Sequence, residues 1–375
     1  MSESHVFSPT LLNSFRFSYS RAAFGNDSLS GLIGPQFSLV PGQEIGGISV
    51  SGITGFGPDG SAPSRNEQNI FTWSDDLFYT SGQHSWKFGT LINRYQQYVS
   101  PFLTGRGSIS FPNLTAFLNG PYTSYSAATP GAVMTRSYRS TTTGFYIQDD
   151  LRVRPSFTLN LGLRYEFMTV PVEVFGRNTA LRDVQHDANT TLGPVYRNPS
   201  LRNFSPRFGF AWDVRGDGKT AVRGGFGLLH DIGNLGSALL QGGIATPPFS
   251  SRSNVQVPVG RPLPFSLSLP LFFPPESVGK ELRTVDYHVQ QPHMLQYNFT
   301  VERQLPFSMG LTVAYGGSRG INLFQVKEGN PTVPQVLPDG RLFWTGTDPR
   351  TNPNWENILS SQLEGVPGTT RCRSG

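Results

Sequence analysis

The chain has 375 residues, of which 15% are charged and 12% are aromatic, including 28 Phe. A soluble domain usually carries about 25% charged residues, and no run of about 18 apolar residues occurs, so the composition excludes a membrane-spanning helix and argues against an ordinary soluble enzyme. The formal net charge is +5, but the arginines are scattered singly and form no basic stripe, so the sequence predicts no nucleic-acid partner.

Strict alternation of apolar and polar residues begins at residues 14–19 and recurs along the chain. Such alternation predicts β-strands with one apolar and one polar face. In residues 158–167, every second side chain is Leu, Tyr or Phe, whereas the intervening residues are polar or Gly. In chain order the strand-like segments are residues 14–19, 67–80, 84–99, 138–154, 158–167, 207–213, 219–230, 295–301 and 309–315.

Short turns and long loops alternate between these segments. The short turns predict antiparallel hairpins, which pair residues 67–80 with 84–99, 138–154 with 156–171, 203–215 with 219–231, and 292–304 with 308–317. The long segments are rich in Gly, Pro, Ser and Asn and cover residues 22–66, 100–137, 172–202 and 232–291. Loops of this length are uncommon in soluble domains, whereas outer-membrane barrels combine short periplasmic turns with long extracellular loops.

The two faces of the predicted strands differ in a way that favours a membrane barrel. The polar face consists of Gly, Ser, Asn, Arg and Gln, rather than the Lys and Glu of a water-exposed sheet. We therefore expect Leu161, Phe210 and Phe299 to point outward to lipid. The residues expected to face the lumen are Arg164, Glu166, Arg207, Arg223 and Glu302. The alternative is a soluble extracellular β-rich module for binding or adhesion, in which the same strands form a sandwich or propeller.

Several short motifs resemble catalytic or metal sites, and each has a simpler interpretation. Residues 316–320 match the nucleophile-elbow pattern of hydrolases, but β-like sequence follows where a helix is required. Residues 218–220 resemble the end of a phosphate-binding loop, but Asp213 stands where that motif needs Gly. We interpret both as strand or turn segments. The sequence thus predicts no enzyme activity, no cofactor and no metal site.

Paired carboxylates and histidines are further candidate sites. The pairs Asp75-Asp76 and Asp149-Asp150 put one carboxylate on each face of a strand, so neither pair converges on one substrate bond. His288 and His293 are separated by five positions and Pro292 lies between them, which is a poor zinc geometry. We expect the carboxylates near a membrane interface or in hydrogen bonds within the lumen.

An ordered series of short motifs resembles the β-barrel of TonB-dependent outer-membrane receptors, specifically the large Oar-like subfamily. The most recognisable hairpin is Phe145-Tyr146-Ile147-Gln148-Asp149-Asp150 followed by Leu159-Asn160-Leu161-Gly162-Leu163-Arg164-Tyr165-Glu166. Further matches are His84-Ser85-Trp86-Lys87-Phe88-Gly89, Ser205-Pro206-Arg207-Phe208-Gly209-Phe210-Ala211, Arg223-Gly224-Gly225-Phe226-Gly227 and Val313-Ala314-Tyr315-Gly316-Gly317-Ser318-Arg319-Gly320.

The resemblance implies an all-β, antiparallel up-and-down transmembrane barrel in the outer membrane of a Gram-negative bacterium. Residues 1–375 are expected to form a partial barrel of about eight to ten strands of a larger one, with recognisable strands at about residues 11–358 and an atypical tail at 359–375. We find no signal peptide, plug or coupling motif in the sequence, so an internal fragment is expected.

The resemblance also implies a function and partners for the full-length parent. The parent would take up a bulky nutrient, such as a chelate, vitamin, saccharide or peptide, in an energised process. It would contact outer-membrane lipid and an inner-membrane TonB-type energy-coupling protein. The chain alone is not expected to transport anything, because an open sheet leaves unpaired strand edges in lipid.

Overall fold

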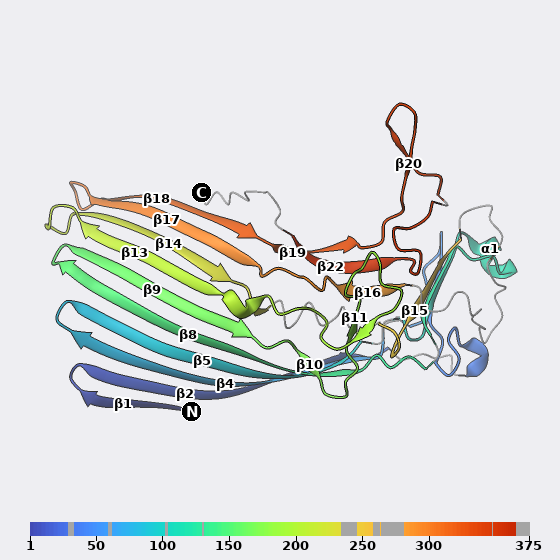
Figure 1. The fold of residues 1–375 in the computed structure, drawn as a ribbon, viewed down its shortest axis with the longest axis horizontal. Helices are drawn as coiled ribbons and strands as arrows, with labels where there is room; N and C mark the ends of the chain where they lie inside the picture. Colours follow the sequence, from blue (N-terminus) through green and yellow to red (C-terminus); the bar gives the residue numbers. More distant parts are fainter. Residues whose placement is uncertain are drawn as a thin grey trace.

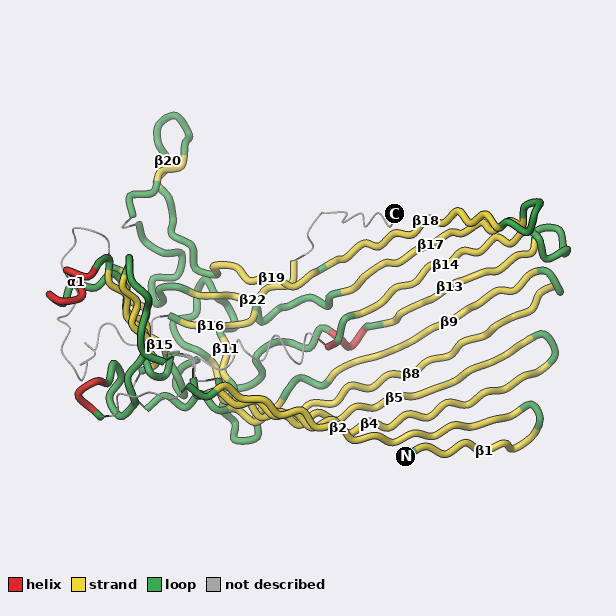
Figure 2. Tube along the Cα trace, turned by 180° about the vertical axis from the view of Figure 1, so that it is seen from behind, coloured by secondary structure: helices red, strands yellow, loops and turns green. Residues whose placement is uncertain are grey.

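The computed structural model describes residues 1–28, 34–58, 62–101, 104–129, 131–233, 246–257, 263, 281–346 and 348–364. Long strands lie side by side in one sheet and run along the longest axis of the molecule (Figure 1). Short turns join them at one end, and the longer connections gather at the other (Figure 2). No helix in the described part of the chain has the length and hydropathy needed to cross a membrane.

The main sheet confirms the predicted antiparallel, up-and-down arrangement. Ten strands follow each other in sequence order and pair antiparallel throughout. A short eleventh strand, β10 (Val172–Glu173), pairs with β8 beyond the end of β9. The ten strands are β1 (Ser2–Ser8), β2 (Leu11–Asn26), β4 (Ser64–Ser81), β5 (His84–Ser100), β8 (Arg136–Arg154), β9 (Phe157–Met168), β13 (Phe204–Asp213), β14 (Thr220–His230), β17 (His293–Gln304) and β18 (Gly310–Ile321).

All four predicted hairpins form: β4 with β5, β8 with β9, β13 with β14, and β17 with β18. The turn between β13 and β14 shows why its sequence reverses the chain. The Asp213 carboxylate accepts hydrogen bonds from the amides of Gly216 (3.0 Å) and Gly218 (2.8 Å), and both glycines have φ of 71°. Glycine adopts this left-handed conformation at little cost. The segment resembling a phosphate-binding loop is therefore a hairpin turn.

Strand β1 was not predicted. Its sequence lacks a regular alternation, because Ser, Glu and His occupy all of its positions except Val6 and Phe7. It forms because it pairs with β2 from Ser2↔Arg16 to Ser8↔Leu11, with an irregularity between Val6 and Ser8. In the described residues β1 and β18 each have one neighbour in the main sheet and do not pair with each other, so the sheet is an open, partial barrel.

The pairing register gives the main sheet two chemically distinct faces. The apolar face carries Phe15, Trp73, Phe88, Ile147, Leu161, Phe208, Phe226, Phe299 and Tyr315. The polar face carries Asp76, Lys87, Tyr146, Arg164, Glu166, Arg207, Arg223 and Glu302. Large side chains of the apolar face are open to the surroundings: Leu161 is 41% exposed, Phe208 45% and Tyr315 64%.

The segments expected to be irregular loops contain a second small sheet. Strands β3 (Gly47–Val50), β6 (Ser108–Phe111), β7 (Ser124–Ala128) and β15 (Arg252–Gln256) pair in the order β15-β7-β6-β3, with β3 and β6 parallel. Their buried core includes Tyr125, whose hydroxyl donates to the Leu39 carbonyl (2.8 Å). Burial raises the pKa of that hydroxyl above its usual value. Helix α1 (Leu114–Asn119) lies beside β6.

The remaining elements at the loop end are short. Strand β22 (Ile358–Glu364) lies between β16 (Leu282–Val285) and β19 (Leu323–Glu328), parallel to the first and antiparallel to the second. Residues 359–364, at the start of the segment expected to be an atypical tail, thus belong to a paired strand. Residues 365–375 lie outside the described residues. The other elements are β11 (Thr179–Ala180), β12 (Thr191–Leu192), β20 (Gln335–Val336), β21 (Leu342–Phe343), and the 3-10 turns Pro35–Phe37 and Ser200–Arg202.

The loop-end elements pack on the polar face of the main sheet. In β8 the polar-face residues Arg136, Tyr138, Ser140 and Thr142 are buried, whereas the residues between them are only half-buried. Tyr138 and Val99 contact Ala128 of the small sheet in one buried cluster. The polar face is thus the side of the sheet over which the long connections fold.

Candidate functional site

The polar face of the first long strands holds a network around the Asp76 carboxylate. Asp76 is only 5% exposed and accepts hydrogen bonds from the Arg16 guanidinium and the Tyr146 hydroxyl. The Lys87 ammonium lies 4.0 Å from the same carboxylate and 5.3 Å from the centre of the Tyr146 ring. Four strands, β2, β4, β5 and β8, each contribute one of these side chains. Charge-assisted hydrogen bonds of this kind tie neighbouring strands together.

A glycine makes room for this network. Gly89 of β5 lies directly opposite Tyr146 of β8. A Cβ atom at position 89 would collide with the Tyr146 ring, which lies over the glycine on its way to Asp76. The absence of a side chain at this one position therefore lets Tyr146 reach Asp76 across an intervening strand.

The five residues predicted to face the lumen share the polar face, but they form separate groups. The Arg164 guanidinium lies 2.5 Å from the Glu166 carboxylate within β9. Arg223 of β14 and Glu302 of β17 form a second pair at 3.3 Å. Arg207 of β13 packs over the positions of Gly162 and Gly227 in the strands on either side. That this face lines an aqueous lumen stays a prediction.

The paired carboxylates divide between the two faces as predicted. Asp76 lies on the polar face, whereas Asp75 lies on the apolar face and accepts a hydrogen bond from Asn13 (2.8 Å). Asp149, also on the apolar face, lies near the short-turn end, 2.6 Å from Nδ1 of His84. Neither pair converges on one point.

The other motifs are accounted for by strands and loops. Residues 316–320, which match the nucleophile-elbow pattern, lie inside the continuous strand β18 and not between a strand and a helix. His293 begins β17, and its ring lies 5.6 Å from that of His230, whereas the His288 ring lies 5.3 Å from that of Tyr287. Within the described ranges no group of three His, Cys, Asp or Glu side chains could hold a metal ion.

Sequence reasoning missed a cavity where the polar face meets the loop end. The cavity has a volume of about 210 Å³. It is lined by Gln68, Tyr95, Gln97, Ser140, Thr142, Met168, Ile232 and Gly233. The lining residues that belong to strands lie mostly on the polar face. The alternation in the sequence could therefore have predicted their face, though not the cavity. The contact with residues 232 and 233 joins distant parts of the chain, and no local pattern indicates it.

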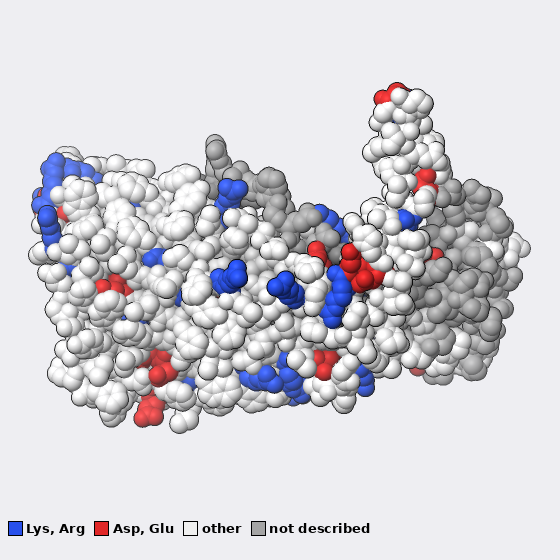
Figure 3. Space-filling view, viewed as in Figure 1, with Lys and Arg blue, Asp and Glu red and all other residues white. Residues whose placement is uncertain are grey.

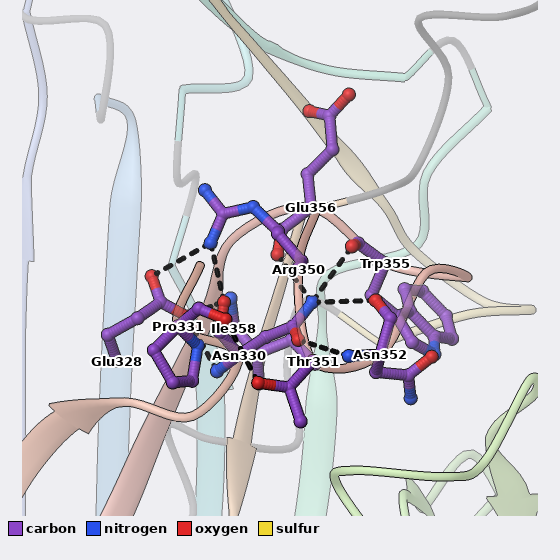
Figure 4. Close-up of polar contacts among 9 residues, drawn as sticks. All are labelled: Glu328, Asn330, Pro331, Arg350, Thr351, Asn352, Trp355, Glu356 and Ile358. Carbon is purple, nitrogen blue, oxygen red and sulfur yellow. Dashed lines mark hydrogen bonds and ion pairs between the residues drawn. The ribbon is translucent and has the colours of Figure 1, made fainter. Parts of the chain in front are cut away.

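A polar cluster holds the base of the loop that carries β20 and β21 (Figure 4). The Asn330 side-chain amide donates to the carbonyls of Asn352 (2.9 Å), Trp355 (2.8 Å) and Glu356 (2.9 Å), and its oxygen accepts from the Asn352 amide (2.7 Å). Arg350 donates to the Asn330 carbonyl (2.6 Å). These bonds tie the two ends of the loop together, and from this base the loop projects away from the rest of the molecule (Figure 1).

Charged side chains are unevenly distributed over the visible surface of the sheet. Figure 3 shows few of them over the middle of the strands, whereas Lys and Arg gather at the short-turn end of the upper strands and again toward the loop end. Few charges over the middle and more toward the ends is the distribution expected of a surface that crosses a hydrocarbon layer.

Comparison with known proteins gives one family match. A family model described as outer membrane beta barrel domain matches residues 1–366. No curated protein matches the chain.

Solved structures with a similar strand arrangement are outer-membrane transporters and receptors. The outer membrane transporter YddB from Escherichia coli is 10% identical, with a TM-score of 0.47, and the match covers 96% of this chain and 42% of that one. The siderophore receptor PirA from Acinetobacter baumannii is 11% identical, with a TM-score of 0.42 and coverage of 95% and 38%. The ferric-catecholate import receptor Fiu from E. coli K12 is 14% identical, with a TM-score of 0.42 and coverage of 91% and 41%. The chain thus spans less than half the length of these proteins.

Proposed function

The chain belongs to the outer membrane β-barrel domain family, and from this premise we propose that its main sheet is part of the wall of an energised outer-membrane transporter of the TonB-dependent type. It lies in the outer membrane, so its strands must satisfy the requirements of a hydrocarbon environment. Transport, rather than catalysis, is the role that we assign to it.

The separation of the two faces of the main sheet carries this proposal. A continuous band of exposed Phe, Leu, Ile and Tyr side chains covers one face, and ion pairs such as Arg164–Glu166 and Arg223–Glu302 lie on the other. Transmembrane barrels have this outward apolar and inward polar arrangement. We assign the polar face to the lumen, because the loop-end elements fold over that face and cover its end.

The proposed wall requires further strands. Each unpaired backbone group in hydrocarbon costs several kcal/mol, and the described residues leave one edge of β1 and one edge of β18 without a partner in the main sheet. We propose that additional strands pair with these edges and close a larger barrel, wide enough for a bulky solute.

The nutrient would be recognised at the loop end of the polar face. There the cavity beside Gln97 and Thr142 offers neutral hydrogen-bonding groups, next to residues 232 and 233 of a long connection. The candidate classes are a chelate, a vitamin, a saccharide or a peptide. An inner-membrane TonB-type protein is the proposed source of energy.

The soluble binding module is the rival interpretation, and the apolar face argues against it. Soluble monomers rarely expose contiguous apolar patches larger than a few hundred Å². Here exposed aromatic and aliphatic side chains continue across the sheet from Phe15 on β2 to Tyr315 on β18.

Uptake in cells tests the transport proposal. Cells with and without the gene for the full-length parent would be supplied with labelled ferric catecholate, cobalamin, an oligosaccharide and a peptide, each with and without a protonophore. We expect uptake of one probe to depend on the gene and to stop when the protonophore dissipates the proton gradient. Gene-dependent uptake that persists with the protonophore, or no gene-dependent uptake of any probe, would contradict the proposal.

A further inference from the structure

Four arginines gather on the apolar face at the loop end of the first long strands. Arg21, Arg65, Arg94 and Arg139 come from β2, β4, β5 and β8, respectively. The register aligns Arg21 with Asn69, Asn69 with Gln96, and Gln96 with Arg139 in one row across the four strands. We call these four arginines the arginine belt.

The side chains of the arginine belt are held in place, and Arg21 and Arg65 are exposed whereas Arg94 and Arg139 are half-buried. Glu67 lies between two of them, 2.8 Å from Arg21 and 2.6 Å from Nε of Arg65, and these two arginine side chains are 47% and 70% exposed. Arg94 donates to the Thr141 hydroxyl (2.9 Å) and Arg139 to the Tyr138 carbonyl (2.9 Å). Four guanidinium groups against the single Glu67 carboxylate leave the belt strongly cationic.

The arginine belt directly continues the apolar band. Tyr19 and Phe71, whose rings lie 5.0 Å apart, form the row that contains Arg94, and Phe17 and Trp73 form the next row toward the middle of the strands. Aromatic girdles mark the depth at which hydrocarbon gives way to headgroups. The belt therefore lies at headgroup depth, on the side of the sheet that meets lipid, in the leaflet next to the long loops.

We propose that the arginine belt is a binding site for the phosphate groups of a phosphorylated glycolipid in the outer leaflet, of the lipopolysaccharide type. Guanidinium groups bind phosphate through paired, charge-assisted hydrogen bonds, and the apolar band below the belt accommodates the acyl chains of the same molecule. The inference rests on the assignment of the apolar face to lipid and not on transport.

Lipid retention by the intact protein tests the site. The protein would be extracted from outer membranes in mild detergent, and the bound phosphorylated glycolipid per protein would be measured by mass spectrometry. Replacing all four belt arginines with Gln should reduce this amount by roughly tenfold. The matched control, Arg215→Gln with Arg303→Gln, removes cations at the short-turn end and should leave it unchanged. Equal retention by the belt variant and the wild type would overturn the proposal.

A second measurement uses only the wild-type protein and so does not depend on the variant's folding. The extracted protein would be offered the glycolipid with its phosphates or after enzymatic dephosphorylation. We expect retention of the phosphorylated form only, and weaker retention at high salt. Equal retention of both forms would show that acyl chains alone bind, which contradicts the site. A protein that transports none of the probes can still retain the phosphorylated glycolipid. The experiments therefore distinguish a failure of the transport proposal from a failure of the glycolipid site.

Discussion

At the scale of single residues, aromatic rings on one strand pack directly over glycines on the neighbouring strand. Gly89 lies opposite Tyr146, and Gly224 lies opposite Phe210, where an added Cβ would come 2.5 Å from the ring. The sequence did not predict the face of Tyr146 or its partner, because Phe145, Tyr146 and Ile147 are three consecutive large apolar side chains. Tyr146 reaches Asp76 only because β4, β5 and β8 pair side by side. No single segment of the sequence specifies that pairing.

Substituting Gly89 tests this packing. Gly89→Ala should lower the free energy of unfolding by about 1–3 kcal/mol, because the methyl group displaces the Tyr146 ring and breaks its hydrogen bond to Asp76. The measurement is urea unfolding of the protein in detergent, followed by tryptophan fluorescence. Gly316→Ala is the matched control, since a Cβ there meets no atom within 4 Å. Equal midpoints for the two variants would contradict the account.

At the scale of elements, local pattern predicted the hairpins and missed most of the loop end. The turn at 216–218 and the alternation on both sides of it specify β13 and β14 without reference to the rest of the chain. The small sheet requires β15 to pair with β7 across more than 120 positions, and β3 to pair in parallel with β6. Such pairing leaves little signal in any one segment, because each strand has only four or five residues.

The cluster around Asn330 stabilises the projecting loop, because the Asn330 side chain donates hydrogen bonds to backbone carbonyls at the base of that loop. Asn330→Ala removes the donor to three carbonyls, and a buried group left without its partner costs roughly 1–3 kcal/mol. We therefore expect faster trypsin cleavage after Arg341, an exposed residue in the projecting loop. The cleavage rate at limiting protease is the measurement.

Asn189→Ala provides the control for this variant, because Asn189 is an exposed residue in another of the long connections. Its cleavage rate after Arg341 should match that of the wild type. If Asn330→Ala were cleaved no faster than the control, the cluster would not hold the loop.

At the scale of the whole molecule, the two open edges determine what the chain can do. The sequence predicted about eight to ten strands, and the main sheet has ten in succession with one short addition. We expect residues 1–375 reconstituted alone in liposomes to give no specific, saturable flux of ions or of the four labelled probes, because unpaired edges are unstable in hydrocarbon. Flux assays on sealed liposomes measure this, and saturable flux would show that the sheet closes without further strands.

The central claim is that the apolar face of the main sheet meets lipid while the polar face meets water. Spin labels attached to single cysteines at positions 159 to 164 of β9, in a Cys372→Ser background, test it in outer membranes. The account predicts that labels at 159, 161 and 163 collide mainly with dissolved oxygen, which concentrates in lipid, and that labels at 160, 162 and 164 collide mainly with a water-soluble nickel chelate. Reversed alternation, or equal access of the nickel chelate to all six positions, would contradict it.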